Sequence, residues 1–222
     1  PNKANGEPPI RDEKQRLTEA THLMHVIDLS MWPKKATKDE NAASAELPPH
    51  PEEYVVTVGQ VGHAKGAWAT VESLKNTGLG LTQVGGGSDE DKAALVAHGA
   101  SIGVEVVCMP RLSQPALRSL IRNARAMVSH AHNEPFGLTP LEAMAIGVPA
   151  LMVNEGGFAD TMSPVNSGRL IQRGDLGAWK GAYLDAKDPE LRKAWAEAGR
   201  THVETHFSMK VQIEALEQLF TQ

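Results

Sequence analysis

The fold is decided by the stretch HNEPFGLTPLEAMAIGVP, residues 132–149, which is followed by the apolar run 150–153. This stretch predicts a polar loop that leads into a short helix and then a strand. Pro140 fits the first turn of the helix, because a proline there has no N–H to lose. We expect the helix to begin between Gly137 and Thr139.

Two carboxylates lie in this stretch, Glu134 before the turn and Glu142 in the first turn of the expected helix. Gly137 is the one glycine between them, so the backbone can turn closely around a ligand at that point. The free N–H groups at a helix N-terminus attract anions. The loop, the helix start and both carboxylates can therefore face one pocket, which predicts a site for an anion that carries hydroxyl groups.

Outward from this stretch, short apolar runs alternate with amphipathic segments from Tyr54 onward. The runs expected to form strands are 54–58, 79–84, 104–109, 126–130 and 150–153. The segments expected to form the helices after them are 65–76, 88–99, 113–125, 138–146 and 157–163. A short extended piece at 169–172 precedes helices near 175–185, 188–205 and 209–221. This alternation predicts an α/β fold, a Rossmann-like parallel sheet with helices on both faces and right-handed crossovers.

Sheets of this kind bind ligands outside the carboxyl ends of their strands. The loops at 59–65, 85–88, 110–113 and 131–138 therefore lie on the candidate binding edge. The glycine run in 85–88 is either a tight turn or a phosphate-binding loop, and we favour the turn.

Residues 1–53 are the least regular part of the chain. Residues 12–24 carry apolar side chains at helical spacing, 25–29 fit a strand, and 33–53 fit a linker or a long ordered surface loop. We therefore divide the chain into three parts. These are 1–53, the end of a preceding domain or a linker; 54–207, a Rossmann-like domain; and 208–222, a C-terminal helix.

The pattern E-P-F-G-L-T-P-L-E-A-M-A-x-G-x-P at 134–149, with Asn154-Glu155-Gly156-Gly157-Phe158 after it, resembles a known family. It is similar to the donor-binding domain of the retaining GT-B enzymes of glycosyltransferase family 4. The resemblance extends roughly from Tyr54 to Phe220. It implies the second domain of a GT-B fold, which binds a nucleoside diphosphate sugar and transfers the sugar to an acceptor with retention of configuration.

The loop after the first strand resembles the family's G-R-x-x-x-x-K-G, in which the arginine and lysine hold the diphosphate. Lys65 matches the lysine, but Gln60 stands at the arginine position. Glutamine can donate hydrogen bonds to phosphate but cannot neutralise its charge. The loop with Arg111 and Leu112 resembles the one beside the base and ribose. Leu112 would cover the base, whereas Arg111 would stack on it, replace the charge missing at Gln60, or stay exposed without a role.

The resemblance also implies roles for the central stretch. Glu142 would bind the ribose and Glu134 the hydroxyls of the donor sugar, while Lys65 and the backbone amides of residues 137–139 would hold the diphosphate. These groups would stabilise the negative charge that develops on the β-phosphate as the leaving group departs. The expected catalytic residues are Glu134 and Lys65. The expected donor-binding residues are Gln60, Arg111, Leu112, Gly137, Leu138, Thr139 and Glu142.

His130 and His132 raise the question of a metal site, since residues two apart on a strand point to the same face. No acidic or cysteine partner lies at a recognised ligand spacing, and the family that the chain resembles uses no divalent ion in catalysis. We therefore expect no metal and no cofactor.

The 222 residues allow one or two domains, and a content of 41% hydrophobic and 22% charged residues is typical of soluble globular proteins. The single cysteine, Cys108, excludes a disulfide framework and a cysteine-based zinc site. A net charge of −5 argues against a nucleic-acid-binding surface. No apolar stretch approaches the ~20 residues of a membrane span, and no signal-sequence pattern opens the chain, so we expect a cytoplasmic protein.

An acceptor-binding domain usually needs ~150 residues of its own, more than residues 1–52 provide. We therefore expect the acceptor domain in a longer chain or in a partner subunit. The resemblance implies that the C-terminal helix, 208–222, crosses to that acceptor domain. The acceptor is not readable from the sequence, and peripheral membrane contact through the missing part stays open. Two rival interpretations remain: a non-catalytic GT-B-like subunit that binds a glycan or a partner protein, and an enzyme of the same architecture with other chemistry, such as an epimerase or phosphorylase.

Overall fold

The computed structural model describes residues 26–162 and 165–220, with side chains in the last helix described up to Gln218. The helix expected at 12–24 lies outside the described residues.

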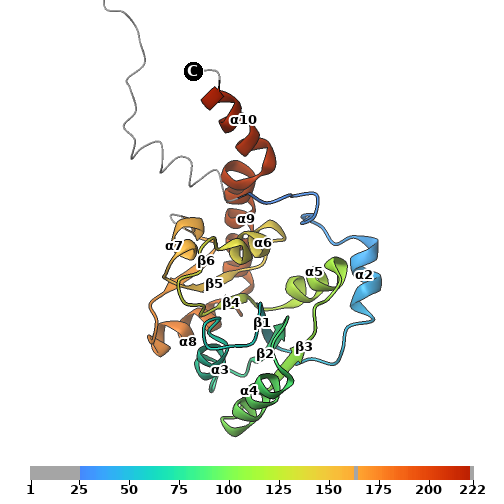
Figure 1. The fold of residues 1–222 in the computed structure, drawn as a ribbon, viewed down its shortest axis with the longest axis vertical. Coiled ribbons are helices and arrows are strands. Elements are labelled where there is room, and N and C mark those ends of the chain that lie inside the picture. The colour runs from blue at the N-terminus through green and yellow to red at the C-terminus, as the bar shows by residue number, and fades with distance from the viewer. Residues whose placement is uncertain (1–25, 163–164, 221–222) are drawn as a thin grey trace, which may run out of the picture.

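The centre of the fold is a six-stranded sheet in the order β3-β2-β1-β4-β5-β6, and every neighbouring pair is parallel (Figure 1). The strands are β1 (Tyr54–Val58), β2 (Gly80–Val84), β3 (Val106–Met109), β4 (Met127–Ser129), β5 (Ala150–Val153) and β6 (Gly168–Ile171). All five predicted strands are therefore present, and the predicted extended piece is β6. The expectation of a parallel Rossmann-like sheet is confirmed.

Helices cover both faces of this sheet, with α3, α4 and α8 on one face and α5, α6 and α9 on the other (Figure 1). The helices that follow β1 to β5 are α3 (Ala67–Ser73), α4 (Asp89–Ser101), α5 (Gln114–Asn123), α6 (Leu138–Ala145) and α7 (Gly157–Met162). The C-terminal part contains α8 (Leu176–Asp185), α9 (Pro189–His202), the π-helical turn η1 (Val203–Phe207) and α10 (Met209–Phe220).

The core lies between the sheet and its two helical layers. Val55, Leu81 and Leu151, one from each of three strands, are fully buried. Strands of a parallel sheet are covered on both faces, which explains why the sequence shows continuous apolar runs here and no alternation. The buried runs thus identified the strands correctly.

The direction in which strands are added reverses between β1 and β4. The chain moves outward from β1 to β3, returns through α5 to β4, and then moves outward to β6. In open α/β sheets the crevice at such a reversal is the usual ligand site. The loops after β1 and β4 are therefore the first place to look for function.

The linker or ordered surface loop predicted over 33–53 is wrong for residues 38–44, which form helix α2 (Lys38–Ser44) packed on α5. The side chain of Glu40 is 1% exposed and accepts hydrogen bonds from Nε of Arg118 (3.2 Å) and Nε of Arg122 (2.6 Å). Trp32 is buried in the same core as the sheet. Sequence periodicity missed this attachment because two distant arginines hold the helix and no apolar stripe does.

The C-terminal helices also differ from the expectation of one helix over 188–205. Helix α9 ends at His202 and continues as the η1 turn, after which Ser208 pairs with Ile27 in an isolated parallel bridge. That bridge is all that the described residues show of the strand predicted at 25–29. Among the residues that the structure describes, no helix has the length and apolar character needed to cross a membrane.

Candidate functional site

The loops after β1 and β4 are joined to each other at the reversal point. The N–H of His132 donates to the carbonyl of Ala64 (2.9 Å), and the Thr70 hydroxyl lies 3.0 Å from Nδ1 of His130. Gly66 has a φ of 71°, and a β-carbon there would collide with the backbone of His130. The glycine is therefore required for the close contact between the two loops.

Lys65 and Glu134 meet across this junction. Nζ of Lys65 lies 2.6 Å from Oε2 of Glu134, and the two side chains are 47% and 21% exposed. The structure thus brings the two predicted catalytic residues into direct contact. Both remain open to solvent and to a ligand.

Helix α6 begins at Leu138, within the predicted interval, and its N-cap is Gly137 with a φ of 64°. A β-carbon on Gly137 would lie 2.7 Å from the carbonyl oxygen of Gly157, so only glycine fits. Pro140 occupies the first turn as expected. Glu142 falls at the start of the second turn and not in the first.

The turn at Gly156 and Gly157 supports the loop that carries Glu134. The N–H of Gly157 donates to the carbonyl of Glu134 (2.7 Å), and a β-carbon on Gly156 would lie 2.7 Å from that same oxygen. The glycine pair therefore allows the backbone of the β5–α7 turn to pack directly under the Glu134 loop.

Arg173, which sequence reasoning missed, connects three loops at this edge. From the loop after β6, its Nε and Nη2 donate to the two carboxylate oxygens of Glu155, each at 2.7 Å. Nη1 donates to the carbonyl of His130 (3.0 Å) and Nη2 to that of Ala131 (3.1 Å). The guanidinium therefore spans from β6 across the β5 loop to the base of the Glu134 loop. No sequence motif marks it, because its partners are 18, 43 and 42 positions away.

Glu142 is a half-buried carboxyl group without a fixed counter-charge. Burial raises its pKa to about 7. In the described part of the chain it makes no hydrogen bond or ion pair. A carboxyl group in this state is an acceptor that gains from hydroxyl donors of a ligand.

The other predicted donor-binding residues lie on the same sheet edge but make fewer contacts. Gln60 is exposed in the β1–α3 loop that also carries Lys65. Arg111 is exposed in the loop after β3, and it has no hydrogen-bond or ion-pair partner among residues 26–162 and 165–220. Leu112 packs partly against the core, and Leu138 is 44% exposed at the start of α6. Thr139, the next residue of that first turn, is half-buried.

His130 and His132 do not share one face of a strand, because β4 ends at Ser129. His130 is 3% exposed and stacks on Trp179 at 3.7 Å between ring centroids, whereas His132 is exposed. Burial, followed by the charge of Arg173, lowers the pKa of His130 to about 3. This histidine is therefore a neutral core residue. The described residues contain no group of three or more His, Cys, Asp or Glu side chains that could hold a metal ion.

The glycine run at 85–88 packs against the β1–α3 loop. The N–H of Val61 donates to the carbonyl of Gly86 (2.9 Å), and a β-carbon on Gly87 would lie 2.9 Å from Val61 Cβ. This geometry agrees with the tight-turn interpretation.

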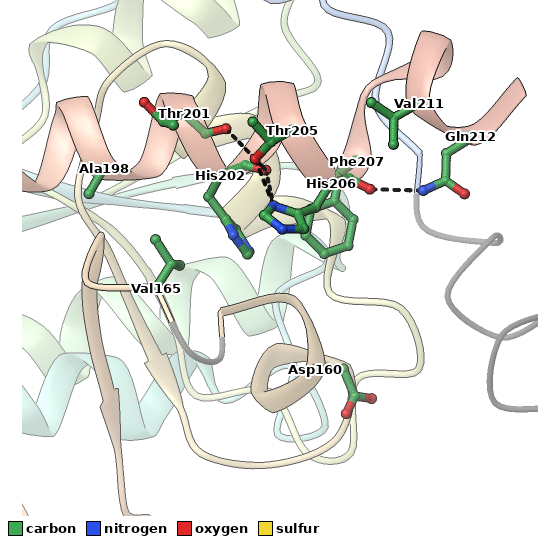
Figure 2. A pocket seen from close by; sticks show the side chains of 10 residues that line it. All are labelled: Asp160, Val165, Ala198, Thr201, His202, Thr205, His206, Phe207, Val211 and Gln212. Atoms are coloured by element: carbon green, nitrogen blue, oxygen red, sulfur yellow. Dashed lines mark hydrogen bonds between the residues drawn. The ribbon is translucent and has the colours of Figure 1, made fainter. Parts of the chain in front are cut away.

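A separate cavity of about 580 Å³ lies where α9, η1 and α10 pass α7 (Figure 2). Its lining includes Asp160, His202, His206 and Phe207. Figure 2 shows His202 and His206 side by side on the η1 side of the cavity. None of the predicted donor-binding residues lines it.

Residues 38–202 match the family described as glycosyl transferases group 1. The chain is 31% identical over 131 residues to alpha-1,3/1,6-mannosyltransferase alg-2 of Neurospora crassa. The aligned region covers 58% of this chain and 28% of that protein.

Among solved structures, sucrose-phosphate synthase from Thermosynechococcus elongatus superposes with a TM-score of 0.73 at 26% identity, over 89% of this chain and 51% of that one. Anabaena Alr3699/HepE, solved in complex with UDP-glucose, gives a TM-score of 0.72 at 17% identity, over 89% of this chain and 56% of that one.

The chain thus spans between about a quarter and somewhat over half of the length of these relatives. Its sheet and helical layers match those of GT-B glycosyltransferases. With the family match extending over most of its length, this chain belongs to the glycosyl transferases of group 1.

Proposed function

We propose that the chain is the donor-binding domain of a retaining glycosyltransferase of family 4. In this proposal it binds a nucleoside diphosphate sugar, and the sugar passes to an acceptor held by another domain or subunit. The complex of Anabaena HepE with UDP-glucose supports a nucleotide sugar as the ligand class. The assignment to family 4 and the retention of configuration rest on the motif at 134–149.

The observation that carries the proposal is the contact between Lys65 and Glu134 at the point where the strand order reverses. A cation and a sugar-binding carboxylate meet there beside the N-terminus of α6, whose free N–H groups suit a diphosphate. Glu142 lies in the second turn of the same helix and is free to accept hydrogen bonds from ribose. One edge of the sheet therefore offers a partner for each part of the donor.

In this proposal, chemistry begins when the bond between the sugar and the diphosphate breaks. Negative charge then grows on the β-phosphate while the sugar takes on oxocarbenium character. Lys65 and the amides of residues 137–139 stabilise that charge, and the amides are already oriented by the fold. No divalent ion and no cofactor is part of this scheme.

The Lys65–Glu134 ion pair must rearrange when the donor binds. Ion pairs between partly exposed side chains contribute about 0–1 kcal/mol. A charge-assisted hydrogen bond from Lys65 to phosphate is worth about 1.5–3 kcal/mol. The exchange is therefore favourable, and it leaves Glu134 available for the hydroxyls of the sugar.

Calorimetry with UDP, GDP and ADP in the presence of EDTA tests the proposal. We expect at least one of the three to bind, because the counter-charge comes from the protein. A lack of binding by all three at millimolar concentration would contradict the donor-domain assignment and favour a non-catalytic subunit.

The two glutamates can be separated with the nucleotide that binds. Glu142→Ala should weaken the free nucleoside diphosphate, because Glu142 holds the ribose. Glu134→Ala should leave the free nucleotide unchanged and reduce only the additional affinity for the nucleotide sugar. Equal effects of both substitutions on the free nucleotide would refute these roles.

A further inference from the structure

A second charged site lies at the opposite edge of the sheet from the donor loops. A cavity of about 310 Å³ is lined by Arg125, Gly147, Lys187, Pro189, Arg192, Lys193 and Ala196. Arg125 precedes β4 and its N–H donates to the carbonyl of Tyr54, the first residue of β1 (2.8 Å). The cavity is therefore at the amino ends of the strands. We refer to it as the cationic pocket, because four of its lining side chains are basic.

The positive charge of the cationic pocket is only partly compensated. Arg125 forms a two-pronged ion pair with Glu53, in which its Nε lies 2.5 Å from Oε2. Hydrogen bonds and charge from Arg125, with the charges of Lys187 and Arg192, hold the pKa of Glu53 below its usual value against the effect of burial. The carboxylate of Glu53 is therefore the counter-charge of three cations. The neighbouring Asp188 is engaged as the N-cap of α9, where it accepts from the N–H of Leu191 (2.8 Å).

The guanidinium of Arg192 is held rigidly at the wall of the pocket. It donates to the carbonyls of Arg125 (2.6 Å), Ala124 (3.3 Å) and Ala186 (3.3 Å). Burial, and then the nearby charge of Arg125, lower the pKa of Arg192. An anion bound nearby would offset the repulsion between Arg192 and Arg125. Because the guanidinium of Arg192 is already fixed in place, little conformational entropy would be lost on binding.

Two lysines complete the site and still have free donors. Nζ of Lys187 uses one hydrogen bond, to the carbonyl of Thr77 (2.9 Å). Lys193 is exposed and makes no hydrogen bond or ion pair within the described ranges. Nη1 of Arg125 is likewise unused there. Donors from three elements therefore surround a space that is large enough for a small anion.

We propose that the cationic pocket binds a phosphate group, either as inorganic phosphate or as the end of a small phosphomonoester. Guanidinium and ammonium donors match phosphate oxygens in geometry and charge. In a chain whose net charge is −5, the four basic side chains of the pocket are a local concentration of positive charge. The site is independent of the donor edge, so it neither needs nor supports the proposed transfer reaction.

The test is an NMR titration of the ¹⁵N-labelled chain with inorganic phosphate and, separately, with glycerol phosphate. Ionic strength and pH are held constant with sodium chloride and buffer. We expect saturable shifts of the backbone N–H signals of Gly147, Lys187, Asp188 and residues 190–193. Tighter binding of glycerol phosphate than of phosphate would identify a phosphomonoester as the ligand, and the reverse order would identify the free ion.

Two matched double substitutions distinguish phosphate binding in the cationic pocket from nonspecific attraction to exposed lysines. Lys187→Gln with Lys193→Gln should weaken phosphate by about tenfold for each lysine, the effect of one lost charge-assisted hydrogen bond. Lys180→Gln with Lys210→Gln removes the same charge from exposed positions elsewhere and should change nothing. Lys193→Glu, at an exposed position where folding is not at risk, should abolish binding.

Phosphate can also bind at the donor edge, and Lys65→Ala distinguishes that binding from binding at the cationic pocket. The shifts at the cationic pocket should persist in Lys65→Ala. Equal phosphate affinity in the two double variants, or shifts confined to residues 59–66 and 132–139, would overturn the proposal.

Discussion

Nζ of Lys65 lies 2.6 Å from Oε2 of Glu134, although the two residues are 69 positions apart in the chain. The contact exists because β1 and β4 are neighbours in the sheet, so that the loops after them meet. It places the cation that we propose to bind phosphate beside the carboxylate that we propose to bind the sugar.

Lys65→Ala should weaken the nucleoside diphosphate by about 1.5–3 kcal/mol, because it removes a charge-assisted hydrogen bond to phosphate. Gln60→Arg should strengthen binding, since it adds a second cation to the same loop. Calorimetry measures both effects, with Lys75→Ala at an exposed position as the control. If neither Lys65→Ala nor Gln60→Arg changes the affinity, the diphosphate lies elsewhere.

The raised pKa of Glu142, about 7, predicts a dependence of stability on pH. The folded-state pKa lies above the unfolded one, so the protonated carboxyl group contributes stability at low pH, and this contribution is lost as the pH rises through about 7. Glu142→Gln keeps a neutral group at every pH. Urea denaturation should therefore show the variant more stable than wild type at about pH 8 and nearly equal to it at about pH 5. Glu46→Gln, at an exposed position, is the control, and an equal difference at both pH values would contradict the prediction.

A nucleotide sugar should bind more tightly than the free nucleotide, and Arg173→Ala should reduce this difference in affinity by about tenfold. A tenfold change corresponds to the loss of roughly one charge-assisted hydrogen bond. The reason is that Arg173 holds the carbonyls of His130 and Ala131, at the base of the loop that carries Glu134. Arg173→Lys should restore part of the effect. The exchange Glu155→Arg with Arg173→Glu should not restore it, because a carboxylate cannot donate to the carbonyls of His130 and Ala131. Full recovery in this exchange would mean that the ion pair alone is needed.

Glu40→Ala should lower the free energy of unfolding by about 3–5 kcal/mol, because it leaves Arg118 and Arg122 in a buried site without their carboxylate. Chemical denaturation measures the change. Glu46→Ala, two residues beyond the end of α2 and exposed, should change it by no more than about 0.5 kcal/mol. Similar values for the two variants would show that α2 is not a structural part of this domain.

The apolar stripe on α10 should cause the chain to self-associate. Met209, Ile213 and Leu216 are 45%, 48% and 40% exposed on this helix, and in our proposal they contact the acceptor domain. Ultracentrifugation should show association that rises with concentration and is relieved by Ile213→Asp with Leu216→Asp. Leu184→Asp, at a position that is 55% exposed on α8, should leave it unchanged. A monomer at high concentration that these α10 changes destabilise would show that α10 belongs to the core of this domain.

The sequence by itself determined the order and type of nearly all elements from β1 to α10. Buried parallel strands appear as short apolar runs, and glycine or proline marks their ends, so local residues suffice to recognise them. The same holds for the start of α6 at Gly137 and Pro140, where backbone conformation requires those residue types. The run from Glu134 to Pro149 also indicated the family and the residues to examine.

Only the tertiary structure decided which distant residues meet. The strand order brings Lys65 to Glu134, buries His130 against Trp179, and lets Arg173 reach the loop after β4. Glu40 fixes α2 through two arginines on α5, in a segment whose sequence fits a linker. Ion pairs and hydrogen bonds of this kind depend on one or two side chains at long separation. They leave no periodic pattern in the chain, whereas apolar packing against a whole helix or strand does.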